Sequence, residues 1–314
     1  MCPGCPPPAK LVPHVSLDGL DFATFFGDDE EGEGGKDGEG GKGGEGGEGG
    51  GEGGGSAREE RAGKLLFTLL QQAVTLGLDG FVLDAHASLA RYDRPTRLII
   101  APRLHIFVQL LAHQLSLQAA ESHSEKPSAT EGGGSGGRVC CGEGLHLVVP
   151  PHPELFSPSQ FAQLAKPLGG FVLSTANYSA VKGEPGPSAP LSWIRDAVSL
   201  LGAEVDEPQA LSKIMAALPL HGWDFALPDG QGSAVGAQRY LALLGQHPGA
   251  RLEWHADAAE HVFSYSSAQD GRKHALYYPS LRGVSERLGL LRRLGVGLAL
   301  WEIGSGLDYF WDLL

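Results

Sequence analysis

The stretch GFVLDAHA, residues Gly80–Ala87, decides how the chain folds. It is a short apolar run that one Asp and one His interrupt, and it follows a segment with helical spacing, Glu59–Gly77. Short apolar runs bounded by turn residues are typical of buried strands in parallel sheets. Side chains alternate along a strand, so Asp84 and His86 would point to the same side of it. The sequence therefore predicts a buried strand that carries two polar side chains toward the protein interior.

The same strand pattern recurs along the chain and alternates with helical patterns. Strands are predicted at residues 10–17, 79–87, 145–151, 169–179, from 213 onward and at 296–304, and helices at 59–77, 97–120, 157–168, 190–202 and 280–295. This alternation predicts an α/β protein with a parallel sheet, either open or closed into a barrel.

The strand ends favour the closed barrel. No G-x-G-x-x-G motif follows any strand, which argues against a dinucleotide-binding fold. Polar or aromatic residues stand instead where the strands end, and that is where a (β/α)8 barrel places its functional site. These residues are Asp84, His86, Asn177, Tyr178, Trp223, Asp224, Trp301 and Glu302.

Composition limits the classes of partner. The net charge of the 314 residues is −13, and residues 28–56 contribute ten acidic and two Lys side chains to it. The rest is mildly acidic without a basic cluster, so neither nucleic acid nor an anionic membrane surface is an expected partner. No apolar run reaches the ~20 residues that a membrane helix needs, and the N-terminus lacks the features of a signal peptide.

Two segments are low in complexity. Residues 28–56 are mostly Gly and Glu, and residues 122–138 are polar and rich in Gly. Such segments bury too little apolar surface to offset the entropy lost on ordering, so both are predicted to be disordered, as are residues 1–9. The remainder of residues 10–314 is predicted to form one domain that the two inserts interrupt.

The cysteines do not indicate a metal site. Cys2 and Cys5 form a C-x-x-C motif, but no second pair of ligands follows at a suitable spacing. The adjacent Cys140 and Cys141 are interpreted as buried thiols or loop residues. The sequence therefore predicts no metal and no cofactor.

Several stretches carry a family resemblance. They are GVGLALWEIGSGLDYFWDLL (295–314), PGPSAPLSWIRDAV (185–198), EHVFSY (260–265), YYPSL (277–281) and the DGFV that begins at residue 79. In these stretches the chain resembles glycoside hydrolase family 18, the chitinase family. The resemblance implies a chitinase-type (β/α)8 barrel in which residues 10–17 match the third strand. It implies that about two strands and a secretory signal precede this chain in the family, and that the full-length protein is secreted, endomembrane or lysosomal.

The resemblance also implies a damaged catalytic site. Family members carry D-x-D-x-E on the fourth strand, where the Glu is the general acid and the neighbouring Asp orients the acetamido group of the substrate. The matching positions here are Val82, Asp84 and His86. The Tyr that holds the acetamido group on the sixth strand is matched by Ala176. Only Asp84 remains of these catalytic groups, so the resemblance implies an impaired enzyme.

Three interpretations of Asp84 and His86 remain open. His86 could act as the general acid itself, because an imidazolium can donate a proton near neutral pH. The two residues could form a hydrogen-bonded interior pair, or they could contact a sugar. Trp301 matches the Trp on which the family stacks a sugar ring, although a core Trp is the simpler alternative. Trp223 and Asp224 are expected to line the cleft, with Asn177 and Tyr178 beside them, whereas Glu302 is expected to point away from it.

These features predict a catalytically impaired chitinase-like protein that binds chitin-type amino-sugar oligosaccharides in a residual cleft. The alternatives are a weakly active glycoside hydrolase on glycans that contain N-acetylglucosamine, and a scaffold whose surface binds another protein.

Overall fold

The computed structural model describes residues 12–17, 20–26, 57–78, 80–124, 144–205, 208–228, 230 and 232–313. The segments 1–9 and 28–56 and all four Cys lie outside the described residues. The insert predicted at 122–138 lies outside them too, except that residues 122–124 form the end of a helix.

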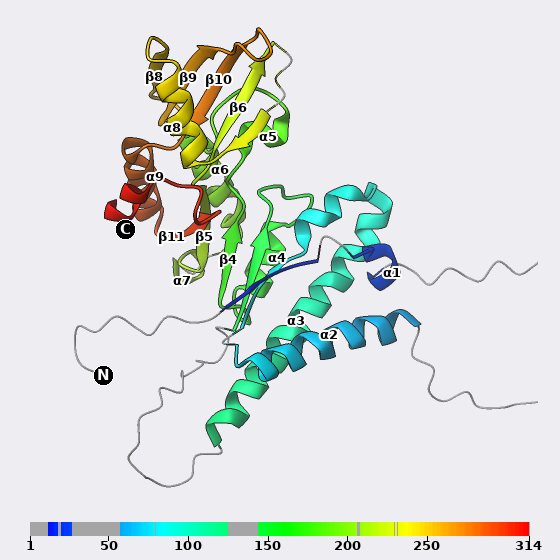
Figure 1. The fold of residues 1–314 in the computed structure, drawn as a ribbon. Coiled ribbons are helices and arrows are strands. Elements are labelled where there is room, and N and C mark those ends of the chain that lie inside the picture. The colour runs from blue at the N-terminus through cyan, green and yellow to red at the C-terminus, as the bar shows by residue number, and fades with distance from the viewer. Residues whose placement is uncertain are drawn as a thin grey trace, which may run out of the picture.

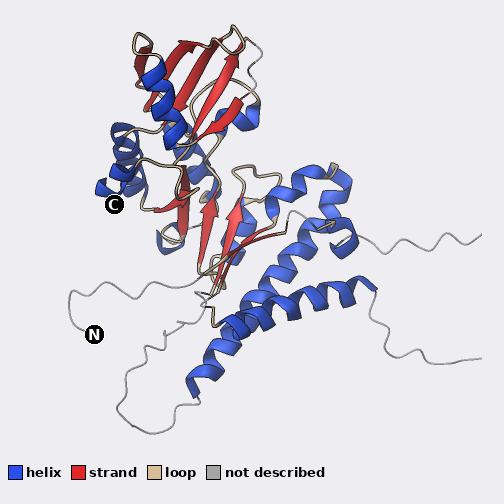
Figure 2. Ribbon diagram, viewed as in Figure 1, coloured by secondary structure: helices blue, strands red, loops and turns tan. Residues whose placement is uncertain are grey.

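A six-stranded parallel sheet forms the centre of the larger part of the molecule (Figures 1 and 2). Its order is β1-β2-β3-β4-β5-β11, and every neighbouring pair is parallel. The strands are β1 His14–Ser16, β2 Phe81–Asp84, β3 Leu145–Val149, β4 Gly170–Leu173, β5 Ile214–Pro219 and β11 Gly297–Trp301. The first and last of these strands in the chain, β1 and β11, are therefore the two edges of the sheet.

Helices cover the outer face of this sheet. Alternate strand residues such as Leu83, Leu147 and Phe171 point into a core that they share with the helices. The helical elements are α1 Phe22–Phe26, α2 Ala57–Leu76, η1 His86–Arg91, α3 Arg94–Ser124, α4 Pro158–Leu164, α5 Tyr178–Lys182, α6 Leu191–Leu201, α7 Pro208–Leu211, α8 Ala237–Gln246, α9 Leu281–Leu294 and η2 Asp308–Leu313. Of these, α8 packs on a second sheet and α5 lies beside that sheet (Figure 1).

The local sequence explains where the helices begin and end. The Ser157 hydroxyl accepts from the backbone N–H of Gln160, whose side chain accepts in return from the backbone N–H of Ser157, so this capping box starts α4. Ser280 caps α9, and Gly295 ends that helix in the left-handed conformation that favours glycine.

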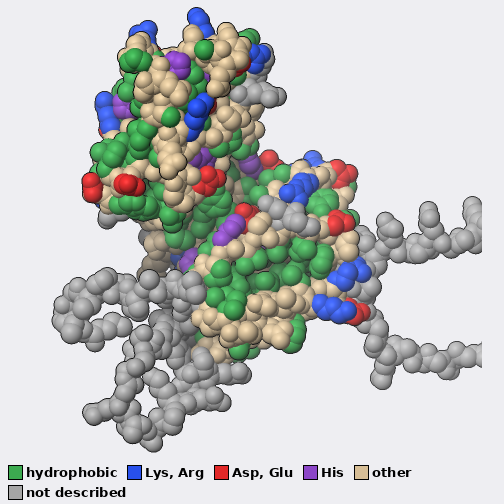
Figure 3. Space-filling view, viewed as in Figure 1, with side chains coloured by type: hydrophobic (Ala, Val, Ile, Leu, Met, Phe, Trp, Pro, Cys, Tyr) green, Lys and Arg blue, Asp and Glu red, His purple; other side chains and the backbone are tan. Residues whose placement is uncertain are grey.

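The long helix α3 has both a buried and an exposed apolar side. Leu104, Val108 and Leu111 are buried in the core, whereas Ile106 and Leu110 are exposed. The expectation that no segment is long and apolar enough for a membrane helix is not met, because residues 94–120 pass this test by length and composition, alone among the helices of the described residues. Figure 3 shows hydrophobic side chains gathered on the lobe that α2 and α3 form. The helix therefore packs on the sheet and also adds to an apolar surface.

A second, antiparallel sheet lies between β5 and α9 in the sequence and above the parallel sheet in Figure 1. Its order is β7-β6-β10-β9-β8. Its strands are β6 Gly222–Leu227, β7 Gly232–Val235, β8 Arg251–His255, β9 Glu260–Ser266 and β10 Lys273–Tyr278. Helix α8 packs on one face through Leu243, beside Phe263 and Leu276. The prediction of a strand opening residues 213–227 is resolved into two strands, β5 and β6, that belong to different sheets.

A buried ion pair joins this accessory sheet to the helices below it. The Arg287 guanidinium on α9 lies 3.2 Å from Glu260 Oε2 at the start of β9, and both side chains are at most 5% exposed. Arg287 also donates to the backbone carbonyls of Ala189, Ala258 and Ala259. The pair thus ties together three segments that are distant in sequence.

Candidate functional site

The inner face of the parallel sheet carries a small apolar cluster. Val148, Val172 and Ala217 are buried there, and Val82 and Trp301 pack against them. Ala176 belongs to the same cluster and is buried. Ala176 therefore lies on the interior side, as its resemblance to the acetamido-binding Tyr position led us to expect, but it offers only a methyl group.

Asp84 stands at the carboxyl end of β2, on the same side as Val82. Its Oδ2 atom lies 3.7 Å from Nε2 of His14 on the edge strand β1. The His14 ring meets the Trp301 ring edge to face, with centroids 5.8 Å apart. Because β1 and β11 are opposite edges of the sheet, this contact shows that the sheet curls until its two edges approach each other.

A second group of polar side chains gathers at the ends of β4, β5 and β11. Oδ1 of Asn177 lies 2.9 Å from Nε2 of His221 and accepts a 2.9 Å hydrogen bond from Nε1 of Trp223. On its other side, Nδ1 of His221 lies 3.2 Å from Oε2 of Glu302. The structure thus brings three strand-end predictions together, Asn177, Trp223 and Glu302, and adds His221 between them.

The backbone at this network is unusual. Both Asn177 and Glu302 have a φ of 64°, in the left-handed region that non-glycine residues seldom adopt. Strained backbone of this kind persists where the surrounding contacts hold it, and such positions cluster at functional sites. Here His221 contacts both strained residues and so links the two strand ends.

The ionisation of His221 is set mainly by burial. Its side chain is 2% exposed, whereas that of Glu302 is 49% exposed. Burial lowers the pKa of His221, and the carboxylate of Glu302 opposes that effect only partly. At neutral pH the His221 ring is therefore neutral and has a single N–H, so it donates to only one of its two acceptors, Asn177 or Glu302. Glu302 presents an accessible carboxylate beside it.

The prediction that His86 faces the barrel interior is wrong. Strand β2 ends at Asp84 and η1 begins at His86, so the alternation of side chains stops before this residue. The His86 ring is fully buried and packs against Phe156, with centroids 4.9 Å apart, on the helix-covered side of the sheet. Burial, with a smaller contribution from His105, lowers the pKa of His86 to about 3. An uncharged ring in this place neither donates a catalytic proton nor pairs with Asp84.

The prediction that Asp224 lines the cleft with Trp223 is wrong as well. Both residues lie within strand β6 and not in a loop, so their side chains point to opposite faces of the accessory sheet. Asp224 is buried on the α8 side, where it accepts a 2.6 Å hydrogen bond from the Tyr265 hydroxyl and lies 3.0 Å from Nδ1 of His274. Trp223 alone is directed toward Asn177.

Tyr178 lies outside both groups. It is the first residue of α5, its ring packs at 5.0 Å from that of Trp193, and its hydroxyl accepts a hydrogen bond from Lys182. No group of three or more His, Cys, Asp or Glu side chains suited to a metal ion occurs among the residues described.

The sequence was compared with protein families and with curated proteins. No protein-family model matches the chain. A Bacillus subtilis protein named as a sporulation-specific glycosylase, YdhD, is 29% identical over 129 residues, which are 39% of this chain and 29% of that protein. The chain therefore spans less than a third of the length of this curated relative.

Solved chitinase structures match over most of the chain. A chitinase from Chromobacterium violaceum superposes with a TM-score of 0.58 and 20% identity, over 82% of this chain and 71% of that one. A mutant class V chitinase from Nicotiana tobaccum, solved in complex with NAG4, superposes with a TM-score of 0.57 and 14% identity, over 80% and 71%. The chain thus has the chitinase-type α/β barrel fold, and the proteins that it is similar to are glycosylases and chitinases.

Proposed function

We propose that this protein binds chitin-type amino-sugar oligosaccharides at the carboxyl ends of its parallel strands and does not cleave them. One observation carries the proposal. The side chain at the general-acid position, His86, is buried away from the strand ends, while Trp301, Trp223 and Asn177 remain there. Indole rings stack on the apolar faces of sugars and donate hydrogen bonds from their N–H groups. The strand ends therefore keep side chains suited to sugar binding, although the general acid is missing.

Two further expectations belong to this proposal. The C-terminal stretch 295–314 resembles chitinase domain-containing protein 1, a divergent branch of the chitinase family. We also propose that the full-length protein is secreted, endomembrane or lysosomal. The fold and the glycosylase relatives support the carbohydrate class of ligand, and the tobacco enzyme solved with NAG4 supports the choice of probe.

Replacement of Trp301 should weaken sugar binding. Stacking on an aromatic ring contributes roughly 0.5–1.5 kcal/mol beyond buried area, so Trp301→Ala should raise the Kd for chitotetraose by about twofold to tenfold. Isothermal titration calorimetry measures the change. The matched control is Trp311→Ala, which removes an exposed indole from η2. Equal affinities of the two variants for chitotetraose would show that Trp301 does not contribute to sugar binding.

Glu302 favours a second candidate function, weak glycoside hydrolysis. Its carboxylate is half exposed at the strand ends and is held at 3.2 Å from His221, whereas the sequence led us to expect that it points away from the cleft. A carboxylic acid in such a place can serve as a general acid or base. Asp84, at the end of β2, would then be the second carboxylate.

A turnover assay separates the two candidate functions. We expect no release of chromophore from a chromogenic chito-oligosaccharide by the unmodified protein. If release occurs, Glu302→Gln should lower its rate by about 10²–10⁴-fold, the usual contribution of a general acid or base. Glu286→Gln, an exposed change on α9, is the control. Turnover that Glu302→Gln abolishes would replace the binding proposal with the hydrolase.

A further inference from the structure

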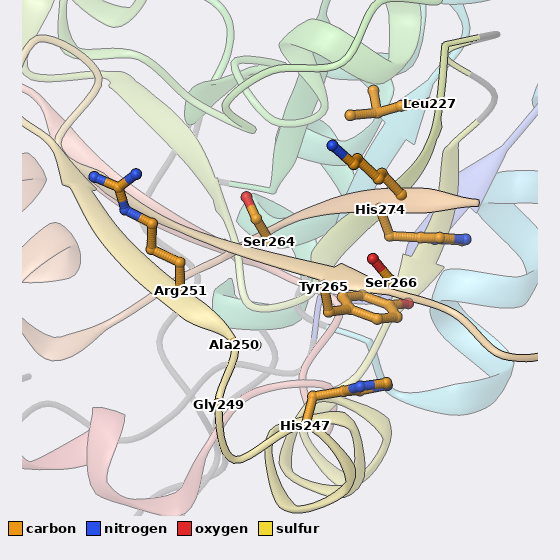
Figure 4. Close-up of a pocket in the computed structure, with 10 residues that line it drawn as sticks. Leu227, His247, Gly249, Ala250, Arg251, Ser264, Tyr265, Ser266 and His274 are labelled. Atoms are coloured by element: carbon orange, nitrogen blue, oxygen red, sulfur yellow. The ribbon is translucent and has the colours of Figure 1, made fainter. Parts of the chain in front are cut away.

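A cavity of about 590 Å³ lies in the accessory sheet, apart from the strand ends of the barrel. It opens where β8 begins. Arg251 is the first residue of β8 and pairs with Ser264, so the last residues of β9, Tyr265 and Ser266, extend past the end of β8. The segment from His247 to Arg251 passes beside this uncovered edge and forms one side of the cavity (Figure 4).

The cavity has a rigid wall of stacked rings. The Tyr265 ring lies between those of His274 and His247, at centroid distances of 4.9 and 4.7 Å. Figure 4 shows these three rings in a column beside the opening. Asp224 holds two of these rings in place, because it accepts a hydrogen bond from the Tyr265 hydroxyl and contacts Nδ1 of His274. The wall is therefore in place before any ligand arrives.

The cationic and hydroxyl side chains lie on the other face of the sheet from the rings, because Tyr265 stands between Ser264 and Ser266 on β9 and His274 follows Lys273 on β10. The cavity is thus lined from both faces at the uncovered edge. Lys273 pairs with Ser266 and Arg251 pairs with Ser264 across neighbouring strands. Because Ser264 and Ser266 are two residues apart on one strand, all four side chains lie on the same face of the sheet. Arg251 is steadied from the side by an ion pair with Glu253.

The described residues that line the cavity include no Asp or Glu, although the chain as a whole carries a net charge of −13. His274 adds no net positive charge, because Asp224 and Asp270 lie at its two ring nitrogens, each at 3.0 Å, and two carboxylates exceed the single charge of a protonated ring. The attraction for an anion therefore comes from Lys273 and from Arg251, whose charge Glu253 partly balances. Leu227 and Ala250 are the apolar side chains of the lining, and the other side chains there carry a polar group.

We propose that this cavity binds the anionic group of a small, hydroxyl-rich ligand, an acidic sugar that bears a carboxylate, sulfate or phosphate. Arg251 and Lys273 hold the anion, and Ser264 and Ser266 donate to it from the same face of the sheet. Charge-assisted hydrogen bonds of this kind are about twice as strong as neutral ones. The volume lies within the range of ~300–1,000 Å³ that small-ligand sites occupy. This site is separate from the one proposed at the strand ends.

The test compares acidic and neutral sugars at low ionic strength. Glucuronic acid, N-acetylglucosamine 6-sulfate, N-acetylglucosamine 6-phosphate and N-acetylglucosamine are titrated by calorimetry, and amide shifts in NMR spectra locate the binding. At least one acidic sugar should bind about tenfold or more tightly than the neutral one, with shifts in β8, β9 and β10. The carboxylate, sulfate and phosphate arms identify the anion.

The variant Arg251→Gln/Lys273→Gln should lose this preference. The matched control is Lys166→Gln/Arg195→Gln, which removes the same charge from exposed positions on the barrel and should keep it. Equal binding of acidic and neutral sugars, or equal losses in the two double variants, would overturn the proposal. Neither result would bear on the strand-end site, because that site is tested with neutral oligosaccharides and Trp301→Ala.

Discussion

Arg287→Met is expected to destabilise the protein by about 3–5 kcal/mol, the usual cost of removing one partner from a buried ion pair. The variant leaves Glu260 buried, with its Oε2 accepting from the backbone N–H of Ser188 at 2.9 Å but without its guanidinium. It also removes the donors for the carbonyls of Ala189 and Ala259. Domains are typically stable by only ~5–15 kcal/mol, so this loss is a large fraction of the total.

Burial explains why the pair is sensitive. It raises the pKa of Glu260 and lowers that of Arg287, so in both residues desolvation outweighs the support that the partner gives to the charge. Each charge is therefore tolerated only because the other is present. The double variant Arg287→Met/Glu260→Gln removes the unpaired charge and should be more stable than Arg287→Met alone.

Urea denaturation followed by Trp fluorescence measures these differences. Arg195→Met, an exposed change on α6, should stay within about 0.5 kcal/mol of the unmodified protein. Two results would contradict this prediction: a loss of stability below about 1 kcal/mol in Arg287→Met, or a double variant that is less stable than Arg287→Met. Either would show that the ion pair contributes little to the stability of this contact between the sheet and α9.

The parallel sheet could be predicted from the sequence because its signals are local. Each strand, such as Gly170–Leu173, is an apolar run between turn residues, and each helix shows its own spacing and caps. Local signals also set the strand ends, and Asn177 follows β4 as expected. Trp223 donates to Asn177 from within β6, a position that no local signal indicated. The chitinase-type barrel fold is confirmed by the solved structures.

The errors arise where a local rule is extended past its range. The alternation of side chains along a strand predicted that His86 points to the same side as Asp84. The strand ends at Asp84, however, and the chain continues as η1 from His86. Asp224 was expected to line the cleft, but it lies in strand β6, where its partner in β10 is Leu276, 52 positions away in the sequence. His221 was missed for a similar reason, since its partners Asn177 and Glu302 are remote in sequence and no spacing links them.

Acid is expected to destabilise the protein through His86. The ring is fully buried, and its pKa falls from 6.5 to about 3, first because of burial and second because of His105. At pH 7 the ring is neutral in both the folded and the unfolded state. Between pH 6.5 and 3 the unfolded state binds the additional proton, so the free energy of unfolding decreases as the pH falls. One pKa unit corresponds to about 1.4 kcal/mol, which gives a loss of roughly 3 kcal/mol at pH 4 from this residue.

His86→Leu isolates the contribution of this residue. The variant removes the titrating group and two ring nitrogens without hydrogen-bond partners among the described residues, so it should cost little at pH 7. Its stability should fall less than that of the unmodified protein between pH 7 and pH 4. Other groups, including His105 and Asp270, also have lowered pKa values and add to the acid sensitivity of both proteins. The informative quantity is therefore the difference between the two pH profiles.

The matched control is His113→Leu, which removes an exposed imidazole from the same region, on α3. Its pH profile should run parallel to that of the unmodified protein. Urea midpoints at pH 7, 6, 5 and 4 supply the three profiles. If the His86→Leu profile also ran parallel to the others, His86 would be charged or hydrated in the folded protein. It would then have access to solvent, and a role for it beside Asp84 would have to be reconsidered.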